Sequence, residues 1–354
     1  MIEKKIEIVI ITYNRYRFLE NTLSQLFKSP FYKCKLTILD NCSSDDTSKI
    51  CEHFIKLFPN MKYIRHDKNI GLGANVLRAF ETSNSLYTWI FGDDDNYDFS
   101  DCEDFIAAID SEDFDLLFNE VHKYEDSNGK TINDLLEEKH SQLNFFEKNE
   151  KGYYPHLVTS GIELSNLIKR YYFLNMSFIG CCVFKTELFD TECIIAGYDN
   201  IYNLYPHFKF MCKSIENNFS IYKVPVDVIE IDYRPSTYSS LRFFNGYFGS
   251  CSMIKDSKLY KDCTYHFFES TFFQLMIWSI LNDKVSAEKN IRNEVSKGKF
   301  KDEINILINT IIKVKGTFKG IFYIIIVLIV SNIPKKTSKK IKDKLEKIRY
   351  NSEN

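Results

Sequence analysis

The stretch IEIVIITYNRYRFLENTLSQLF, residues 6–27, decides the fold. Its first six residues form a nearly continuous apolar run, which is typical of a strand buried on both faces of a parallel sheet. After the segment TYNR, apolar side chains return at Leu19, Leu23, Leu26 and Phe27, a spacing that places them on one face of a helix. The stretch therefore predicts a strand followed by a helix, which is the repeating unit of an α/β protein.

The same unit repeats through the first 100 residues. Further strands are predicted at residues 35–39, 61–65 and 86–91, with helices around residues 50–58 and 75–83. Strands that alternate with helices imply a mostly parallel sheet with flanking helices, in which ligands bind at the carboxyl ends of the strands. The polar residues that directly follow the strands are the site candidates: Thr12, Tyr13 and Asn14, Asp40 and Asn41, His66 and Asp67, and residues 92–96.

The rest of the chain adds strands and then helices. We predict strands at residues 114–119 and 177–184, a helix at 209–215 and an extended segment at 220–232. After about residue 250 the pattern is mostly helical.

Composition limits the class of protein. Hydrophobic residues make up 44% of the 354, as in globular proteins, and the net charge of -2 gives no basic field for nucleic acid. The ten cysteines include no C-x-x-C pair, which argues against a zinc site. Because no export signal precedes the first strand, we expect a cytoplasmic protein with reduced thiols.

The acidic run GDDDN, residues 92–96, directly follows a predicted strand. Crowded carboxylates repel each other, and the repulsion falls when a divalent cation lies between them and a phosphate. A departing diphosphate needs such a cation, because the metal neutralises the charge that builds up on its oxygens. The alternative is a solvated acidic turn, but the position at a strand end favours a metal site.

The segment DNCSSDDT, residues 40–47, follows the second strand and contains several residues that favour caps and turns. Asp40 or Asn41 lies where the edge of a nucleotide base can be hydrogen-bonded, and turn formation is the alternative for Asp40. The capping role fits Asp45 and Thr47.

The segment NIGLGAN, residues 69–75, precedes a predicted helix. Its two glycines permit close approach of the backbone to a ligand, or they shape the turn into the helix. It is not a full dinucleotide fingerprint, since Val76 takes the place of a third glycine.

Taken in order, IVIITYNR (8–15), ILDNCSSDDT (38–47), NIGLGAN (69–75) and WIFGDDDN (89–96) resemble the family 2 glycosyltransferases of the polysaccharide-biosynthesis type. The match covers residues 5–100 well and 175–235 loosely. The resemblance implies the GT-A fold, an α/β architecture with a Rossmann-like, mostly parallel sheet. It also implies an inverting enzyme that uses a UDP-, dTDP- or GDP-linked sugar together with Mn²⁺ or Mg²⁺.

The resemblance also assigns residues to the donor site. Asp95, with Asp93, is expected to bind the metal. The nucleotide is expected to contact Thr12, Tyr13, Asn14, Asp40, Asn41, Gly71, Asn75 and Asp94.

The catalytic base departs from the family pattern. Such enzymes usually carry a Glu-Asp pair at the start of a helix, and its Asp is the base. The segment PHFKFMCKSIENNF, residues 206–219, aligns with that helix without gaps and has His207 at the Asp position. A neutral histidine can accept a proton, although it can also contact the acceptor or cap the helix. Asp199 is the second candidate base, and the missing pair leaves open a non-catalytic relative that binds nucleotide sugar.

The C-terminal region contains the apolar run GIFYIIIVLIVSNI, residues 320–333, with lysines on both sides. It is shorter than the ~20 residues of a membrane-spanning helix, so it predicts peripheral contact with anionic lipid through residues 316–349. A buried helix with a solvated tail is the alternative. Membrane contact predicts that the enzyme lies at the inner face of the cell membrane and acts on a glycan or lipid-linked acceptor. Its product would then belong to surface polysaccharide or lipid-linked oligosaccharide synthesis.

The predicted domains follow from this organisation. Residues 1–240 form the GT-A domain, with a nucleotide-binding half at 1–100 and an acceptor half at 101–240. Residues 241–354 form a helical C-terminal region.

Overall fold

The structure is a computed structural model. It describes residues 2–100, 102–111, 114–122, 154–156, 178–201, 205–217, 219–230, 240–251, 253–254, 277, 280–281, 297–334 and 336–341. Contacts divide the chain into two compact units, which are described separately. The first comprises residues 1–201 and 205–233, and the second comprises residues 202–204 and 234–354.

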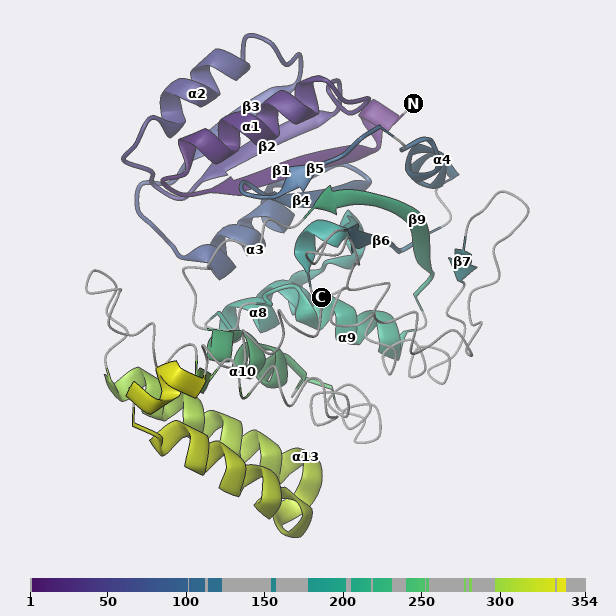
Figure 1. Ribbon diagram of the computed structural model, residues 1–354. Helices are drawn as coiled ribbons and strands as arrows, with labels where there is room; N and C mark the ends of the chain where they lie inside the picture. Colours follow the sequence, from purple (N-terminus) through teal and green to yellow (C-terminus); the bar gives the residue numbers. More distant parts are fainter. Residues whose placement is uncertain are drawn as a thin grey trace, which may run out of the picture. The chain divides into compact units, whose positions relative to one another are not determined.

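Four parallel strands form one half of the sheet in the first unit (Figure 1). Their order is β3-β2-β1-β4, and their bounds are β1 (Ile6–Thr12), β2 (Lys35–Asp40), β3 (Met61–Arg65) and β4 (Tyr87–Gly92). The connecting helices are α1 (Tyr16–Phe27), α2 (Thr47–Phe54) and α3 (Leu72–Thr82). Helix α1 packs against α2, whereas α3 packs against a later helix, α8 (Thr191–Asp199). This half confirms the α/β fold that the alternating pattern predicts.

The other half of the sheet is mixed. It continues from β4 through β8 (Cys182–Lys185), β6 (Leu116–His122) and β9 (Ile221–Glu230) to β5 (Asn96–Tyr97), and β7 (Tyr154–His156) pairs with β9. Strand β8 is antiparallel to both β4 and β6, while β6 and β9 are parallel. The shorter elements of this unit are η1 (Ile2–Lys4), α4 (Glu103–Ser111), η2 (Ile179–Cys181), η3 (Thr186–Leu188) and α9 (Phe208–Glu216).

Strand β4 lies at the centre of an aromatic core. The Trp89 ring is fully buried and contacts Phe31 and Phe105, with centroid distances of 5.5 and 4.6 Å. Its indole N–H donates a 2.8 Å hydrogen bond to the carbonyl oxygen of Gly180. The end of β4 is therefore held firmly, and so is the starting point of the acidic loop that follows it.

The second unit is helical where the structure describes it, as predicted. It contains α10 (Ser240–Cys251) and α13 (Lys297–Asn332), and the Asn245 amide donates a 2.9 Å hydrogen bond to the Glu303 carbonyl oxygen. Among the described residues, no helix has both the length and the apolar character needed to cross a membrane.

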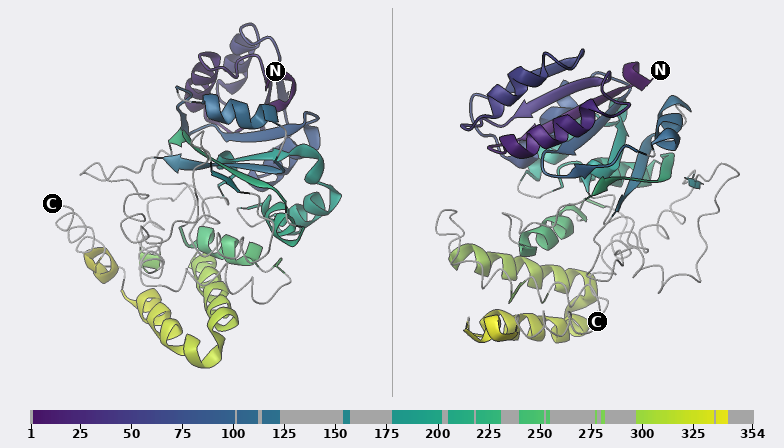
Figure 2. Two further views of the ribbon diagram at one scale, coloured as in Figure 1. Left: turned by 90° about the vertical axis from the view of Figure 1, so that its right-hand side faces the viewer. Right: turned by 45° about the horizontal axis from the view of Figure 1, so that its top comes forward.

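Helix α13 does not run straight. A Cβ placed on Gly320 would lie 3.5 Å from the carbonyl oxygen of Ile311, nine residues earlier. In a straight helix these positions are about 13 Å apart along the axis. The chain therefore doubles back within α13 between Ile311 and Gly320, and Figure 2 shows the resulting hairpin. Residues 320–332 of α13 are called here its second arm.

Candidate active site

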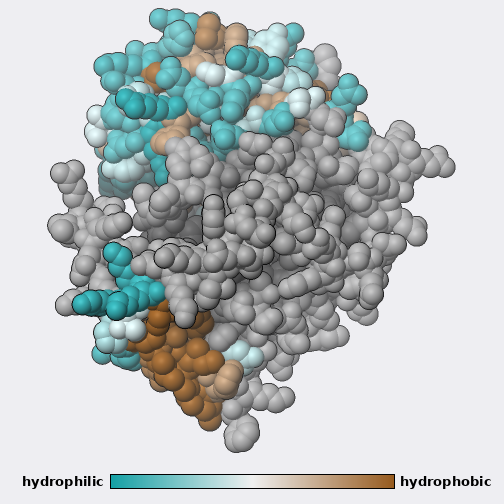
Figure 3. All heavy atoms as spheres, in the orientation of Figure 1, coloured by the Kyte–Doolittle hydropathy of each residue, from teal (hydrophilic) through white to brown (hydrophobic). Residues whose placement is uncertain are grey.

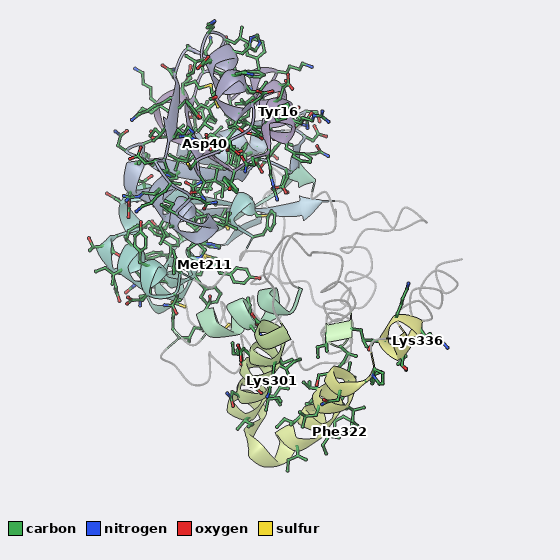
Figure 4. All side chains as sticks on the ribbon, turned by 90° about the vertical axis from the view of Figure 1, so that its left-hand side faces the viewer. Tyr16, Asp40, Met211, Lys301, Phe322 and Lys336 are labelled. Carbon is green, nitrogen blue, oxygen red and sulfur yellow. The ribbon has the colours of Figure 1, made fainter. Side chains whose placement is uncertain are left out.

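The carboxyl ends of the parallel strands bring the predicted residues to one edge of the sheet. Thr12 at the end of β1 pairs with Asp40 at the end of β2, and Ile11 pairs with Gly92 at the end of β4. Asp40 in turn pairs with Arg65 at the end of β3. Figure 4 labels Asp40 and Tyr16 in this part of the first unit. The loops that follow these strands are therefore neighbours.

Asp93 is the buried anchor of the acidic loop, with 4% of its surface exposed. The Thr12 hydroxyl donates to one carboxylate oxygen at 2.6 Å, and the Arg15 guanidinium donates to the other at 3.2 Å. The Thr22 hydroxyl donates to the Asp93 carbonyl oxygen at 3.1 Å. Burial raises the pKa of Asp93 to about 6, although Arg15 and Thr12 favour the charged form. Asp93 thus fastens the loop to β1 and α1.

Asp94 and Asp95 complete the loop in different settings. Asp94 also accepts a hydrogen bond from Arg15, and its side chain is 45% exposed. Asp95 is 8% exposed and folds back over Gly92, where a Cβ would lie 2.8 Å from an Asp95 carboxylate oxygen. A side chain at position 92 would therefore push this carboxylate out of place.

Two carboxylates of the loop share one cationic partner. Asp93 and Asp94 both pair with the Arg15 guanidinium, and Asp95 is the third consecutive carboxylate of the loop. Burial, and then the charges of these carboxylates, raise the pKa of the neighbouring Tyr97 well above its usual value. A divalent cation would relieve the repulsion between the carboxylates.

The loop fits a cation that the substrate helps to bind. The described residues contain no group of three or more His, Cys, Asp or Glu side chains that could hold a metal ion by themselves. Magnesium is usually bound through one or two carboxylates together with substrate phosphates. Of the two predicted ligands, Asp93 has both carboxylate oxygens engaged by Thr12 and Arg15, and metal binding by Asp95 stays a prediction.

Hydrogen bonds join the loop after β1 to the loop after β2. The Asn14 backbone N–H donates to the Ser43 hydroxyl at 2.8 Å, and the Ser44 N–H donates to the Asn14 side-chain oxygen at 2.7 Å. Asn14 has a φ of 53°, a left-handed conformation that asparagine tolerates better than most residues. Tyr13 lies next to this junction with 44% of its surface exposed, so its ring is accessible to a ligand.

Asp40 is buried, and both of its carboxylate oxygens accept hydrogen bonds from other residues of the protein. One carboxylate oxygen accepts from the Ser43 N–H at 2.8 Å and the other accepts from the Tyr63 hydroxyl at 2.6 Å. Burial and this hydrogen bond raise the pKa of Tyr63. These contacts match the turn-forming alternative for Asp40, and recognition of a base by Asp40 or Asn41 stays a prediction.

The loop after β3 is held by asparagines. The Asn41 side chain accepts from the Ile70 N–H at 2.8 Å and donates to Asn69 at 2.9 Å. Asn75 is 2% exposed and donates to the Leu39 carbonyl oxygen at 3.0 Å. Gly71 has a φ of 85°, so this glycine shapes the entry into α3.

Sequence reasoning gave no role to two arginines at this edge. Arg15 directly follows TYN and binds the acidic loop, and Arg65 ends β3 and donates to the Ser43 carbonyl oxygen at 2.9 Å. Arg65 is 43% exposed, so its cation is also accessible to an anionic ligand. Both arginines lie at or just after the end of a strand, as the other candidate residues do. This position in the sequence could have identified them as site candidates.

The two candidate bases lie in contrasting environments. His207, directly before α9, is 1% exposed, and its ring contacts Phe184 and Tyr205. Asp199 ends α8 and is exposed. Two residues later, the Ile201 carbonyl oxygen lies 2.9 Å from the position of a Cβ on Gly73, in the first turn of α3. The end of α8 therefore reaches the edge of the sheet that carries the other candidate residues.

The thiols offer a check on this packing. Burial raises the pKa of Cys34, Cys51 and Cys193 to about 12, whereas Cys42 is half-buried in the loop after β2. Because the thiolate is the reactive form, we expect iodoacetamide at mildly alkaline pH to alkylate Cys42 and spare these three thiols until the protein unfolds. Peptide mass spectrometry of native and urea-unfolded protein measures this. Alkylation of the three at the Cys42 rate in the native state would contradict the described core.

Part of the chain matches a known protein family. A model of the family described as "Glycosyl transferase family 2" matches residues 7–177. The chain contains a family 2 glycosyltransferase domain. The match begins in β1 and includes the acidic loop, which confirms the resemblance read from the motifs.

The chain shares its fold with a solved structure. The crystal structure of S. aureus TarS 1-349 in complex with UDP-GlcNAc superposes with a TM-score of 0.57 at 15% identity, over 95% of this chain and 92% of that chain. The complex of the same fragment with UDP gives a TM-score of 0.51 at 13% identity, over 95% and 91%. No curated protein matches the sequence.

Proposed function

We propose that this family 2 glycosyltransferase transfers a sugar from a nucleoside diphosphate sugar to an acceptor hydroxyl, with inversion and with the help of a divalent cation. The observation that carries the proposal is the acidic loop at the carboxyl end of β4. Asp93 fixes this loop through Thr12 and Arg15, and Asp94 and Asp95 bring two further carboxylates to the same strand end. A diphosphate-bound cation complements such a loop.

The donor would lie along the edge formed by the loops after β1, β2 and β4. The exposed Tyr13 ring offers a surface for the base, and Asp95 would hold Mn²⁺ or Mg²⁺ together with diphosphate oxygens. When bound, the cation would neutralise the charge that develops on the departing diphosphate. The loops are already joined through Asn14 and Ser43, so this site needs little ordering when the donor binds.

Inversion requires that the acceptor hydroxyl attacks the anomeric carbon from the side opposite the diphosphate. A general base must reach the hydroxyl proton directly or through one water. The exposed Asp199 at the end of α8 satisfies this requirement better than His207, whose ring lies in the core. We therefore assign the base to Asp199 and a packing role to His207.

The donor and acceptor classes follow from two further arguments. The TarS fragment with the same fold binds UDP and UDP-GlcNAc, so UDP-linked sugars are the first donors to test, followed by dTDP- and GDP-linked ones. A glycan or lipid-linked acceptor in surface polysaccharide or lipid-linked oligosaccharide synthesis fits the lysine-flanked C-terminal helices.

A thermal-unfolding panel tests the donor site. A ligand at about 100 times its Kd raises the free energy of unfolding by about 2.7 kcal/mol. We expect one class of nucleotide sugar to raise the Tm of the native protein in the presence of Mn²⁺, and to do so far less in EDTA. Asp95→Asn should keep the ligand-free Tm and lose the Mn²⁺-dependent part of the shift. A panel in which no nucleotide sugar shifts the Tm of the native protein would refute the proposal.

A non-catalytic nucleotide-sugar binder is the second candidate, and the burial of His207 favours it. The position that holds the base in the family is occupied here by a ring that is 1% exposed. Release of free nucleoside diphosphate from the donor, with and without Mn²⁺, separates the two candidates. The enzyme releases it at a measurable rate that depends on the metal, whereas a pure binder returns the donor intact.

A further inference from the structure

We propose that the outer face of the C-terminal hairpin binds to the surface of an anionic lipid bilayer and lies in its interface without crossing it. Five side chains of the second arm of α13 define this face, called here the apolar stripe. They are Ile321, Phe322, Ile325, Leu328 and Ile329, with exposed fractions of 46%, 66%, 50%, 43% and 59%. Figure 3 shows apolar side chains gathered on this part of the second unit.

The stripe is one continuous side of a helix. At about 100° per residue, its five members fall within an arc of about 120°. Val327 and Gly320 lie on the opposite side and are buried, with Val327 fully so. The second arm therefore packs one side inward and presents large apolar groups on the other, which soluble monomers rarely do over a contiguous patch.

The size of the arm determines how it meets a bilayer. Residues 320–332 span roughly 20 Å as a helix, which is less than the ~30 Å hydrocarbon core. The chain also turns back between the arms, since Ile311 and Gly320 are in contact. A short hairpin with one apolar side fits the boundary between headgroups and acyl chains, where it buries that side and keeps the other against protein.

The charge of the segment selects the partner. Residues 304–342 contain eight lysines and neither aspartate nor glutamate. Lys336, Lys339 and Lys340 are exposed on the helical turn that directly follows the stripe. Figure 4 labels Phe322 in the stripe and Lys336 in this turn. Within residues 304–342 every acidic or basic side chain is a lysine, and a cationic segment with an apolar side complements anionic headgroups above acyl chains, whereas a second copy of the chain would bring like charges together.

Flotation with vesicles tests the proposal on the full-length protein. We expect binding to phosphatidylcholine vesicles that contain about one third phosphatidylglycerol, and weaker binding to phosphatidylcholine alone. The triple variant F322S/I325S/I329S should lose roughly 100-fold in partition coefficient on both vesicle types, since each change removes much of an apolar side chain from the interface. Its control is I55S/L57S/I195S, which removes three exposed apolar groups elsewhere and should bind like the native protein.

The lysines act through charge, so their effect depends on lipid and salt. The variant K336Q/K339Q/K340Q should lose roughly 5-fold per lysine on anionic vesicles and little on phosphatidylcholine alone. About 0.5 M NaCl should remove the difference in binding between the native protein and the lysine variant. The contribution of the apolar stripe to binding should remain.

Three outcomes would overturn the proposal. The first is a native protein that floats with neither vesicle type, and the second is a stripe variant that is folded by circular dichroism and floats like the control. The third is a native dimer in sedimentation velocity that the stripe variant converts to a monomer without any vesicle binding, which would assign this face to a second copy. None of these outcomes depends on sugar transfer, so the proposed enzymatic function is tested separately.

Discussion

Replacing Asp95 with alanine should lower sugar transfer by at least about 10³-fold, because a cation at a departing diphosphate contributes several kcal/mol to transition-state stabilisation. Asp95 folds over Gly92 at the end of β4, whose other five residues are buried, so the rest of the loop should hold its position through Asp93. The measurement is nucleoside diphosphate release at saturating donor and Mn²⁺. Thermal unfolding in EDTA should give a Tm close to that of the native protein.

The control for this change is Asp302→Ala, which removes an exposed carboxylate from α13 and should retain full activity. Chelation of the metal should lower the activity of the native enzyme as much as Asp95→Ala does. Added Mn²⁺ should restore the activity of the chelated native enzyme and should not restore that of the variant. An enzyme that is fully active in excess EDTA would contradict the assignment of Asp95 to the metal.

Replacing Asp199 with asparagine should lower turnover by roughly 10²–10⁴-fold, the usual contribution of a positioned general base. Donor binding should hardly change, because the base acts on the acceptor. The readout is therefore a loss in kcat together with an unchanged Tm shift by donor and Mn²⁺. Asn keeps the size of the side chain and removes its ability to accept a proton.

His207→Ala provides the contrast. His207 is 1% exposed and contacts Phe184 and Tyr205, so its truncation should leave a cavity and lower the free energy of unfolding by about 2–4 kcal/mol. Turnover per folded molecule should stay within a few-fold of native. If His207→Ala keeps its stability and loses turnover while Asp199→Asn stays active, the base is His207, as the alignment of residues 206–219 first indicated.

The sequence predicted the parallel half of the sheet because hydrophobic spacing there is local. Residues 6–11 lie in β1, and the strand expected at 86–91 is β4, which is shifted by one residue to Tyr87–Gly92. The polar residues after the strands do meet at one edge. Helix ends were less predictable. The helix expected at 50–58 ends at Phe54, and the one expected from Asn75 starts at Leu72, directly after the left-handed Gly71.

The finer features of the site depend on contacts between distant parts of the chain. The helix predicted at residues 209–215 is α9, but the sequence did not predict that Phe184 of β8 would cover His207. Asp40 could not be separated from its turn-forming alternative without Tyr63, which is 23 residues away. The run at 320–333 was recognised as apolar, but only the structure shows the hairpin. Residues 342–349 of the predicted membrane segment lie outside the described residues.

The strand order has a consequence for how the chain folds during synthesis. Strands β1 to β4 and their helices come from one uninterrupted stretch of sequence, so their contacts can form as soon as about 100 residues have left the ribosome. The edge strand β5 can pair only after β9 has been synthesised, since Tyr97 pairs with Ile229. Contacts between such remote positions form slowly, because a long loop must close first. The nascent stretch of residues 1–100 therefore carries β4 as an open edge until β8 is synthesised, and this edge is where a chaperone, or a second nascent chain, would pair.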